Sequence, residues 1–84
     1  MLAIQCKMAR TALGWGVRDL AVAAKVSADT VARLERGEDL KTRTVEAIRI
    51  AMEAAGVVFL DDGEDAPGGP GVRLRSATAG TISE

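Results

Sequence analysis

Hydrophobic side chains recur at helical spacing through the first part of the chain. Leu2, Cys6, Ala9 and Leu13 are separated by four, three and four residues, which places them on one face of a helix over about 2–13. The same pattern predicts three further helices, over about 17–24, 28–36 and 42–55.

Residues that commonly begin or end helices support these limits. Ser27 directly precedes the third helix and is a favourable N-cap. Gly14, Gly37 and Gly56 follow the first, third and fourth helices, and glycine is common just after the end of a helix. We therefore predict a helical domain over residues 1–56.

The pattern changes after the fourth helix. Val57–Leu60 is a hydrophobic run, which favours a strand, and Val72–Arg75 alternates hydrophobic and basic residues, which is typical of a half-buried strand. The intervening residues 61–71 are acidic and rich in Gly and Pro, and they predict a loop. We interpret 57–75 as a strand–loop–strand element and 76–84 as a disordered tail. The expected fold class is mainly α with a short C-terminal pair of β-strands.

Charge is unevenly distributed along the 84 residues. The net charge is −1 and the isoelectric point is near 5.4. Residues 1–60 carry nine basic and seven acidic side chains (9 − 7 = +2), whereas residues 61–84 carry two basic and five acidic ones (2 − 5 = −3). The acidity thus belongs to the C-terminal segment, and a helical domain with a slight positive charge remains compatible with nucleic acid.

Composition also bears on location. There is one cysteine, so no internal disulfide forms, which fits a reducing compartment. No hydrophobic run approaches the roughly 20 residues of a membrane span, and the N-terminus lacks the pattern of a signal peptide. We expect a cytoplasmic protein.

The residue inventory argues against an enzyme. The chain has no His or Tyr, and Cys6 has no candidate base to activate it. The glycine-rich residues 68–71 follow a proline and precede a strand, so they do not open a helix onto a phosphate. The acidic residues of 61–65 do not match a calcium-binding spacing and are interpreted as a solvated loop. No cofactor or metal is expected.

The most informative segment is 17–37. It contains two short helices joined by a tight turn at Lys25 and Val26, which is the spacing of a helix-turn-helix whose second helix can enter a major groove. A short helical hairpin with another role has the same spacing, so the identities of the residues must decide.

Those identities closely resemble the Cro/CI-type phage repressor family, also called the XRE type. The matching residues are Leu13-Gly14-Trp15, Asp19-Leu20-Ala21, Val26-Ser27, Thr30-Val31 and Arg33-Leu34-Glu35-Arg36-Gly37. The resemblance covers about residues 3–56, and Phe59-Leu60 with Gly71–Leu74 is similar to the tail of many short bacterial members. It implies a lambda-repressor-like domain of four or five helices, which usually forms dimeric transcription regulators.

The resemblance also implies site residues. The base-reading positions of the recognition helix, about 28–36, are Ala28, Asp29, Ala32 and Arg33. Thr30 is implied to touch phosphate, and Lys41 and Arg43 are implied to clamp the DNA backbone. Arg10 and Glu35 match positions that form a buried ion pair between the first and third helices.

These positions have chemistry suited to their roles. Arg pairs bidentately with guanine O6 and N7, which makes Arg33 the best candidate to read a base. Asp29 can accept from cytosine N4, or it is a plain carboxylate at the start of a helix. Ala28 and Ala32 offer methyl contact to thymine. Arg18 joins Lys41 and Arg43 as a phosphate-contact candidate, each otherwise being an ordinary surface charge.

Two residues depart from the family pattern. Where the family commonly has a DNA-contacting Gln at the start of the second helix, this chain has Val17, which cannot donate a hydrogen bond. Where the family favours Gly in the turn, it has Lys25, and a left-handed conformation there costs roughly 1 kcal/mol relative to Gly.

Two functions follow from these observations. The first is a sequence-specific transcriptional regulator that binds a near-palindromic operator as a homodimer. The alternative is a protein-interaction module on the same fold, such as an adaptor or an antitoxin-type protein, which Val17 and the acidic isoelectric point favour. We expect residues 57–75 to form the dimer by pairing strands between chains, with a hairpin within one chain as the alternative.

Overall fold

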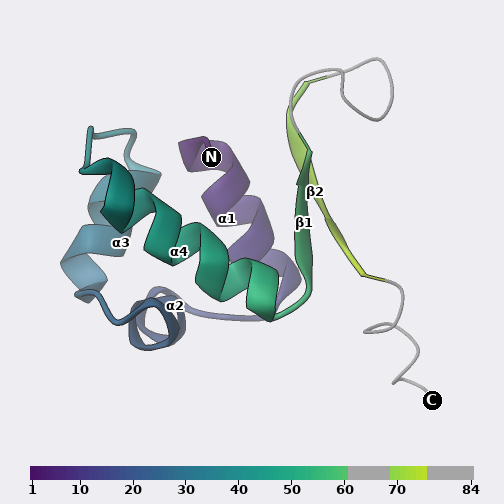
Figure 1. The fold of residues 1–84 in the computed structure, drawn as a ribbon, viewed down its shortest axis with the longest axis horizontal. Coiled ribbons are helices and arrows are strands. Elements are labelled where there is room, and N and C mark those ends of the chain that lie inside the picture. Colours follow the sequence, from purple (N-terminus) through teal and green to yellow (C-terminus); the bar gives the residue numbers. More distant parts are fainter. Residues whose placement is uncertain (61–68, 76–84) are drawn as a thin grey trace.

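The computed structural model describes residues 1–60 and 69–75, which form four helices and a two-stranded antiparallel sheet (Figure 1). In chain order these are α1 (Ala3–Ala12), α2 (Val17–Ala24), α3 (Ala28–Glu35), α4 (Thr42–Ala54), β1 (Val57–Leu60) and β2 (Gly71–Leu74). The predicted fold class is confirmed. Residues 61–68, which make up most of the expected loop, and the expected tail 76–84 lie outside the described residues.

Side chains satisfy backbone donors at the beginning of three helices, where N–H groups lack partners within the helix. Gln5 Oε1 accepts from the Leu2 N–H at 2.8 Å before α1. Asp19 Oδ2 accepts from the Gly16 N–H at 2.7 Å before α2. Ser27 Oγ accepts from the Thr30 N–H at 3.0 Å, which confirms Ser27 as the N-cap of α3.

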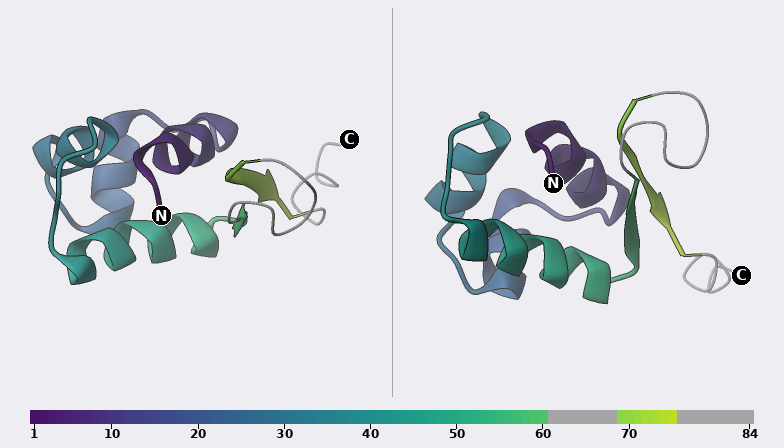
Figure 2. Two further views of the ribbon diagram at one scale, coloured as in Figure 1. Left: turned by 90° about the horizontal axis from the view of Figure 1, so that it is seen from above. Right: turned by 45° about the horizontal axis from the view of Figure 1, so that its top comes forward.

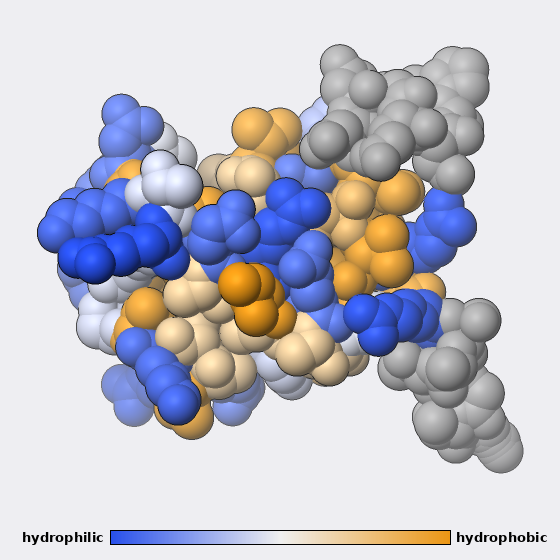
Figure 3. All heavy atoms as spheres, viewed as in Figure 1, coloured by the Kyte–Doolittle hydropathy of each residue, from blue (hydrophilic) through white to orange (hydrophobic). Residues whose placement is uncertain are grey.

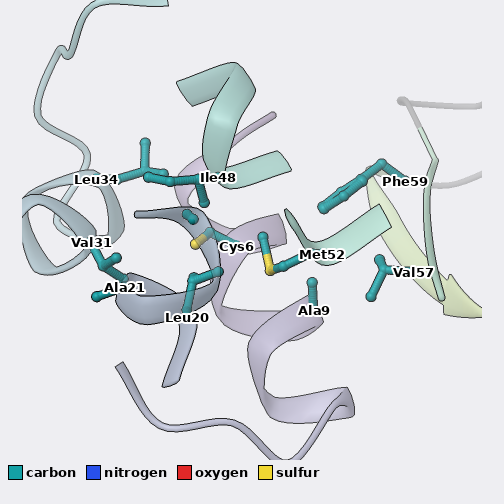
Figure 4. Close-up of a cluster of buried hydrophobic side chains, with 11 residues drawn as sticks. Cys6, Ala9, Leu20, Ala21, Val31, Leu34, Ile48, Met52, Val57 and Phe59 are labelled. Atoms are coloured by element: carbon teal, nitrogen blue, oxygen red, sulfur yellow. The ribbon is translucent and has the colours of Figure 1, made fainter. Parts of the chain in front are cut away.

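The hydrophobic core lies between the helices and extends to the strands (Figure 4). Its fully buried members come from every helix and from β1, and the largest are Leu20, Ile48, Met52, Val31, Val57 and Cys6. Phe59 of β1 continues the core at the hairpin end (Figure 4). The domain and the hairpin therefore share one core.

The predicted apolar face of α1 is wrong at its first position. Leu2 is 53% exposed, because it is the N-cap, with an extended backbone that does not follow the helical phase. Gln5 occupies a buried position instead, at 2% exposed. Its Nε2 donates to the carbonyls of Leu60 and Gly71 at 2.9 and 3.2 Å, so a polar side chain joins α1 to the hairpin.

β1 and β2 pair with each other inside one chain, in the arrangement that the sequence left as the alternative. Val57 pairs with Leu74 and Phe59 with Val72, and these four side chains belong to the core or pack against it. Val58 is 37% exposed on the opposite face. The expectation that both strands need a second chain to find pairing partners is therefore wrong, since each already has one.

The hairpin is fixed to the end of α4. The Arg49 guanidinium lies 5.2 Å from the centre of the Phe59 ring, a cation–π contact. The Arg75 N–H donates to the Gly56 carbonyl at 2.9 Å, and Arg75 Nη2 donates to the Glu53 carbonyl at 3.1 Å. The views of Figures 1 and 2 agree in placing the hairpin and α3 at opposite ends of the helical bundle. No helix in the described part of the chain is long and apolar enough to cross a membrane.

Candidate nucleic-acid interface

The turn between α2 and α3 fixes the angle at which α3 is presented. Lys25 adopts the left-handed conformation, with φ 61° and ψ 42°. The Val26 N–H donates to the Ala21 carbonyl at 3.0 Å, and the Lys25 N–H donates to the Val22 carbonyl at 3.2 Å. This is the conformation that costs a residue with a Cβ roughly 1 kcal/mol relative to Gly, and it closes a turn of only three residues between the two helices.

α3 is amphipathic, and its buried face contains Val31, Leu34 and Glu35. At 100° per residue, the opposite direction is occupied by Asp29, Ala32, Arg33 and Arg36. Three of the four expected base-reading positions therefore lie on the outward face of the helix.

Two other expected contact residues of α3 lie toward its margins. Ala28 is half-buried and packs against the core, so only part of its methyl group faces solvent. Thr30 is half-buried, and its hydroxyl lies 2.8 Å from Ser27 Oγ.

The expected phosphate-contact residues divide into two groups. A hollow of about 340 Å³ between α3 and the start of α4 brings Thr30, Arg33 and Lys41 together, and Asp39, Leu40 and Thr44 complete its lining. Arg18 on α2 and Arg43 on α4 are exposed and do not line it. Figure 3 shows hydrophilic surface at the α3 end of the molecule, and a mixture of hydrophilic and hydrophobic surface over α4 and the strands.

Arg33 is held by a residue that the sequence did not single out. Its Nε donates to Glu38 Oε1 at 3.0 Å, and the Arg36 Nε donates to Glu38 Oε2 at 3.0 Å. These hydrogen bonds from Arg33 and Arg36 lower the pKa of the Glu38 carboxyl below its usual value. Arg36 was detectable from helical phase, being three residues after Arg33, but Glu38 follows Gly37 and no periodic pattern extends to it.

A buried network joins α1 to α3 behind the outward face. Arg10 Nε and Nη2 donate to the two carboxylate oxygens of Glu35 at 2.9 and 3.0 Å, so the structure contains the ion pair implied by the resemblance. The Arg10 side chain is 20% exposed and that of Glu35 is 7% exposed. Bidentate geometry and burial together make this pair a rigid support for α3.

Cys6 completes this network as a hydrogen-bond donor. Its Sγ lies 3.3 Å from Glu35 Oε2, and burial, together with the hydrogen bond to Glu35, raises the pKa of the Cys6 thiol to about 12. Burial also acts to raise the pKa of the Glu35 carboxyl, but the hydrogen bonds from Arg10 and Cys6 outweigh it and hold that pKa below its usual value. Glu35 is therefore a charged, satisfied residue of the core.

Val17, at the start of α2, is half-buried and packs against the core. Its side chain supports α2 from the position where the resembling family commonly presents a polar residue to DNA. This departure therefore has a packing role.

The four helices, the three-residue turn and the solvated face of α3 define a helix-turn-helix domain. The helix-turn-helix domain family matches residues 2–58, which is more than half of the chain, and the chain belongs to that family, which is of the XRE/Cro-like kind. No curated protein matches the chain. A helix-turn-helix domain indicates a DNA-binding regulator.

Proposed function

We propose that the chain is a sequence-specific transcriptional regulator that inserts α3 into the major groove of DNA. The observation that carries this proposal is the convergence of Thr30, Arg33 and Lys41 around one hollow beside the outward face of α3. A base-reading side chain and two candidate phosphate ligands would then meet one stretch of duplex together. We further propose that the chain acts by binding and catalyses no reaction.

The roles proposed for individual residues follow from their chemistry. Arg33 would pair with guanine, Asp29 would accept from cytosine, and Ala32 and the exposed part of Ala28 would contact thymine methyl groups. The remaining candidates would bind phosphates and so contribute affinity for DNA of any sequence. These candidates are Arg18, Thr30, Lys41 and Arg43.

We also propose that the regulator is a homodimer joined through its hairpin region. The hairpin lies at the end of the molecule opposite α3 (Figures 1 and 2), so a two-fold axis there would leave both recognition helices accessible. Such a dimer would bind two half-sites separated by a whole number of DNA turns, each roughly 34 Å, and its operator would be a near-palindrome.

The test begins with selection of preferred sites from a random library of duplex DNA. Arg33→Ala is expected to lower affinity for the selected site by about 1–3 kcal/mol and to relax discrimination at one base pair. Lys41→Ala and Arg43→Ala are expected to weaken binding to all sequences and to flatten the salt dependence by about one unit each.

The control is Lys7→Ala, which removes an exposed charge from α1, outside the proposed interface. It should leave discrimination unchanged. Wild-type affinity that is absent, or that does not fall steeply as salt rises, would refute DNA binding and favour the protein-interaction alternative.

A further inference from the structure

The turn after α3 brings an acidic side chain onto the face that is proposed to read DNA. Gly37, with φ 89°, ends the helix, and its N–H donates to the Leu34 carbonyl at 2.9 Å. The Glu38 N–H donates to the Arg33 carbonyl at 3.1 Å. These two hydrogen bonds form a Schellman motif. The motif fixes the backbone of Glu38 just beyond the C-terminal end of α3, within reach of the Arg33 side chain.

The Glu38 carboxylate lies between two guanidinium groups and uses a different oxygen for each. Oε1 accepts from Arg33 and Oε2 accepts from Arg36, and Arg36 Nη2 is also 2.9 Å from Oε2. Side-chain exposures of 42% for Arg33, 57% for Arg36 and 43% for Glu38 place the whole cluster at the surface. Ion pairs this exposed add little to folding stability, so the cluster is unlike the buried Arg10–Glu35 pair.

The geometry at Arg33 leaves a particular part of its guanidinium for a ligand. Among the described residues its hydrogen bond uses Nε, the inner nitrogen, and the two terminal nitrogens make none. Bidentate recognition of guanine needs two parallel donors from one edge of the guanidinium. A carboxylate that holds Nε restricts the rotation of the side chain while keeping the terminal edge available.

The cluster also changes the charge of the face. Arg33 and Arg36 contribute two positive charges, and Asp29 and Glu38 contribute two negative ones, so this surface is neutral overall. An arginine without an acidic neighbour binds phosphate whatever the base sequence, and that contact carries no sequence information. The outward face of α3 itself therefore gains little from phosphates, which are left to Arg18, Lys41 and Arg43, and it contributes affinity mainly through base edges.

We propose that Glu38 is a positioning residue that sets sequence discrimination, by holding Arg33 through Nε and by neutralising Arg33 and Arg36 toward phosphate. This inference rests on the proposed DNA-binding function. On this inference, a residue just after the recognition helix sets the balance between specific and non-specific binding. Direct base reading stays with Arg33.

The test compares wild type with Glu38→Gln on the duplex selected from the random library and on a scrambled duplex, over a range of salt concentrations. Glu38→Gln is expected to bind the scrambled duplex more tightly, with a salt dependence steeper by about one unit for each additional phosphate that the freed arginines neutralise. The ratio of specific to scrambled affinity is expected to fall roughly tenfold, mainly at the base pair read by Arg33. Thermal melting should show the variant folded, because the side chain is exposed.

Glu46→Gln is the matched control. Glu46 is exposed on α4 and has no hydrogen bond or ion pair with other described residues, so its substitution removes the same charge without releasing an arginine. It should shift both affinities together and keep their ratio. In an Arg33→Ala background, Glu38→Gln should lower the ratio less than it does in wild type, because only its contact with Arg36 then remains to be lost.

Three results would overturn the inference while leaving DNA binding intact. The first is an unchanged ratio in Glu38→Gln. The second is an equal loss of the ratio in the Arg33→Ala background. The third is a new preferred base when the library is selected with Glu38→Gln, which would mean that Glu38 itself reads DNA. Absence of wild-type binding would instead reject the proposed function and this inference with it.

Discussion

Arg10 joins three segments of the chain through one guanidinium. Besides its two hydrogen bonds to Glu35, its Nη1 donates to the Trp15 carbonyl at 3.1 Å, so it ties α1 to α3 and to the loop before α2. Arg10→Met would leave the Glu35 carboxylate buried without its main partner. We expect a loss of about 3 kcal/mol in the free energy of unfolding, measured by urea denaturation at neutral pH.

Arg18→Met is the control for this loss. Arg18 is an exposed arginine on α2 that makes no hydrogen bond with other described residues, so the change should be close to neutral. An Arg10→Met protein that melts within a degree or two of wild type would show that the pair is not a buried support.

Glu35 makes stability depend on pH on the acid side. Its pKa is lowered in the folded state, so its interactions contribute in full above the ordinary pKa of 4.5. Below that pH the unfolded chain takes up the proton first, and stability falls as the pH drops toward the folded-state pKa. A single group contributes a slope of at most about 1.4 kcal/mol per pH unit.

The measurement is the unfolding free energy of wild type and Glu35→Gln between about pH 3 and 6. Glu35→Gln should be less stable at neutral pH, and its stability should fall less steeply with acid, because the proton-linked group is gone. Equal slopes in the two proteins would show that Glu35 does not titrate with folding.

Single residues were predictable where a family position or a periodic pattern contained them. The Arg10–Glu35 pair came from the resemblance alone, since two residues 25 apart carry no pairing signal in one sequence. The roles of Gln5 and Glu38 were predicted neither by a family position nor by a periodic pattern. A buried glutamine interrupts an apolar stripe, and only the tertiary fold brings the Leu60 and Gly71 carbonyls to it.

The limits of the helices and strands were predicted to within about one residue, because Ser27 and the glycines that follow helices mark helix ends and the change in hydrophobic period marks the strands. The bounds of α2 and β1 match the prediction, α4 ends one residue early, and β2 begins and ends one residue earlier than expected. Leu2 was misplaced because a periodic count cannot tell an N-cap from the first helical turn.

The turn between α2 and α3 offers a direct test of backbone strain. Lys25 has φ 61°, a conformation that costs a residue with a Cβ roughly 1 kcal/mol relative to glycine. Its side chain is exposed, so little packing is lost on its removal. Lys25→Gly is expected to raise the unfolding free energy by about 0.5–1 kcal/mol. The gain is reduced by the conformational entropy that glycine, which is more flexible in the unfolded chain, loses on folding.

Lys25→Ala is the control, because it removes the same side chain and retains the strain. It should not be more stable than wild type. If Lys25→Ala and Lys25→Gly gain equally in urea denaturation, the gain comes from the lost charge, and the backbone argument fails.

How the strands pair was beyond the sequence. An apolar run followed by an alternating segment requires partners for two strands, but it does not say whether the partners lie in the same chain. The structure pairs β1 with β2 and buries Val57 and Phe59 against the helices. Removing residues 57–84 would therefore open the core of the helical domain, and dimerisation must be tested by a change confined to the surface.

The outer face of the hairpin provides that change. Val58 is 37% exposed and pairs across the sheet with Arg73, and Leu60 is half-buried beside it. If a second copy covers this face, Val58→Arg places a charge in the interface, and the protein should become monomeric at tens of micromolar by analytical ultracentrifugation. Binding to the selected near-palindrome should weaken more than binding to a single half-site, because linkage of the two half-sites is lost.

Val22→Arg, which alters a 79% exposed valine on α2, is the control and should leave the mass unchanged. A Val58→Arg protein that stays dimeric would move the interface away from the hairpin face, and a monomeric wild type would reject the homodimer itself.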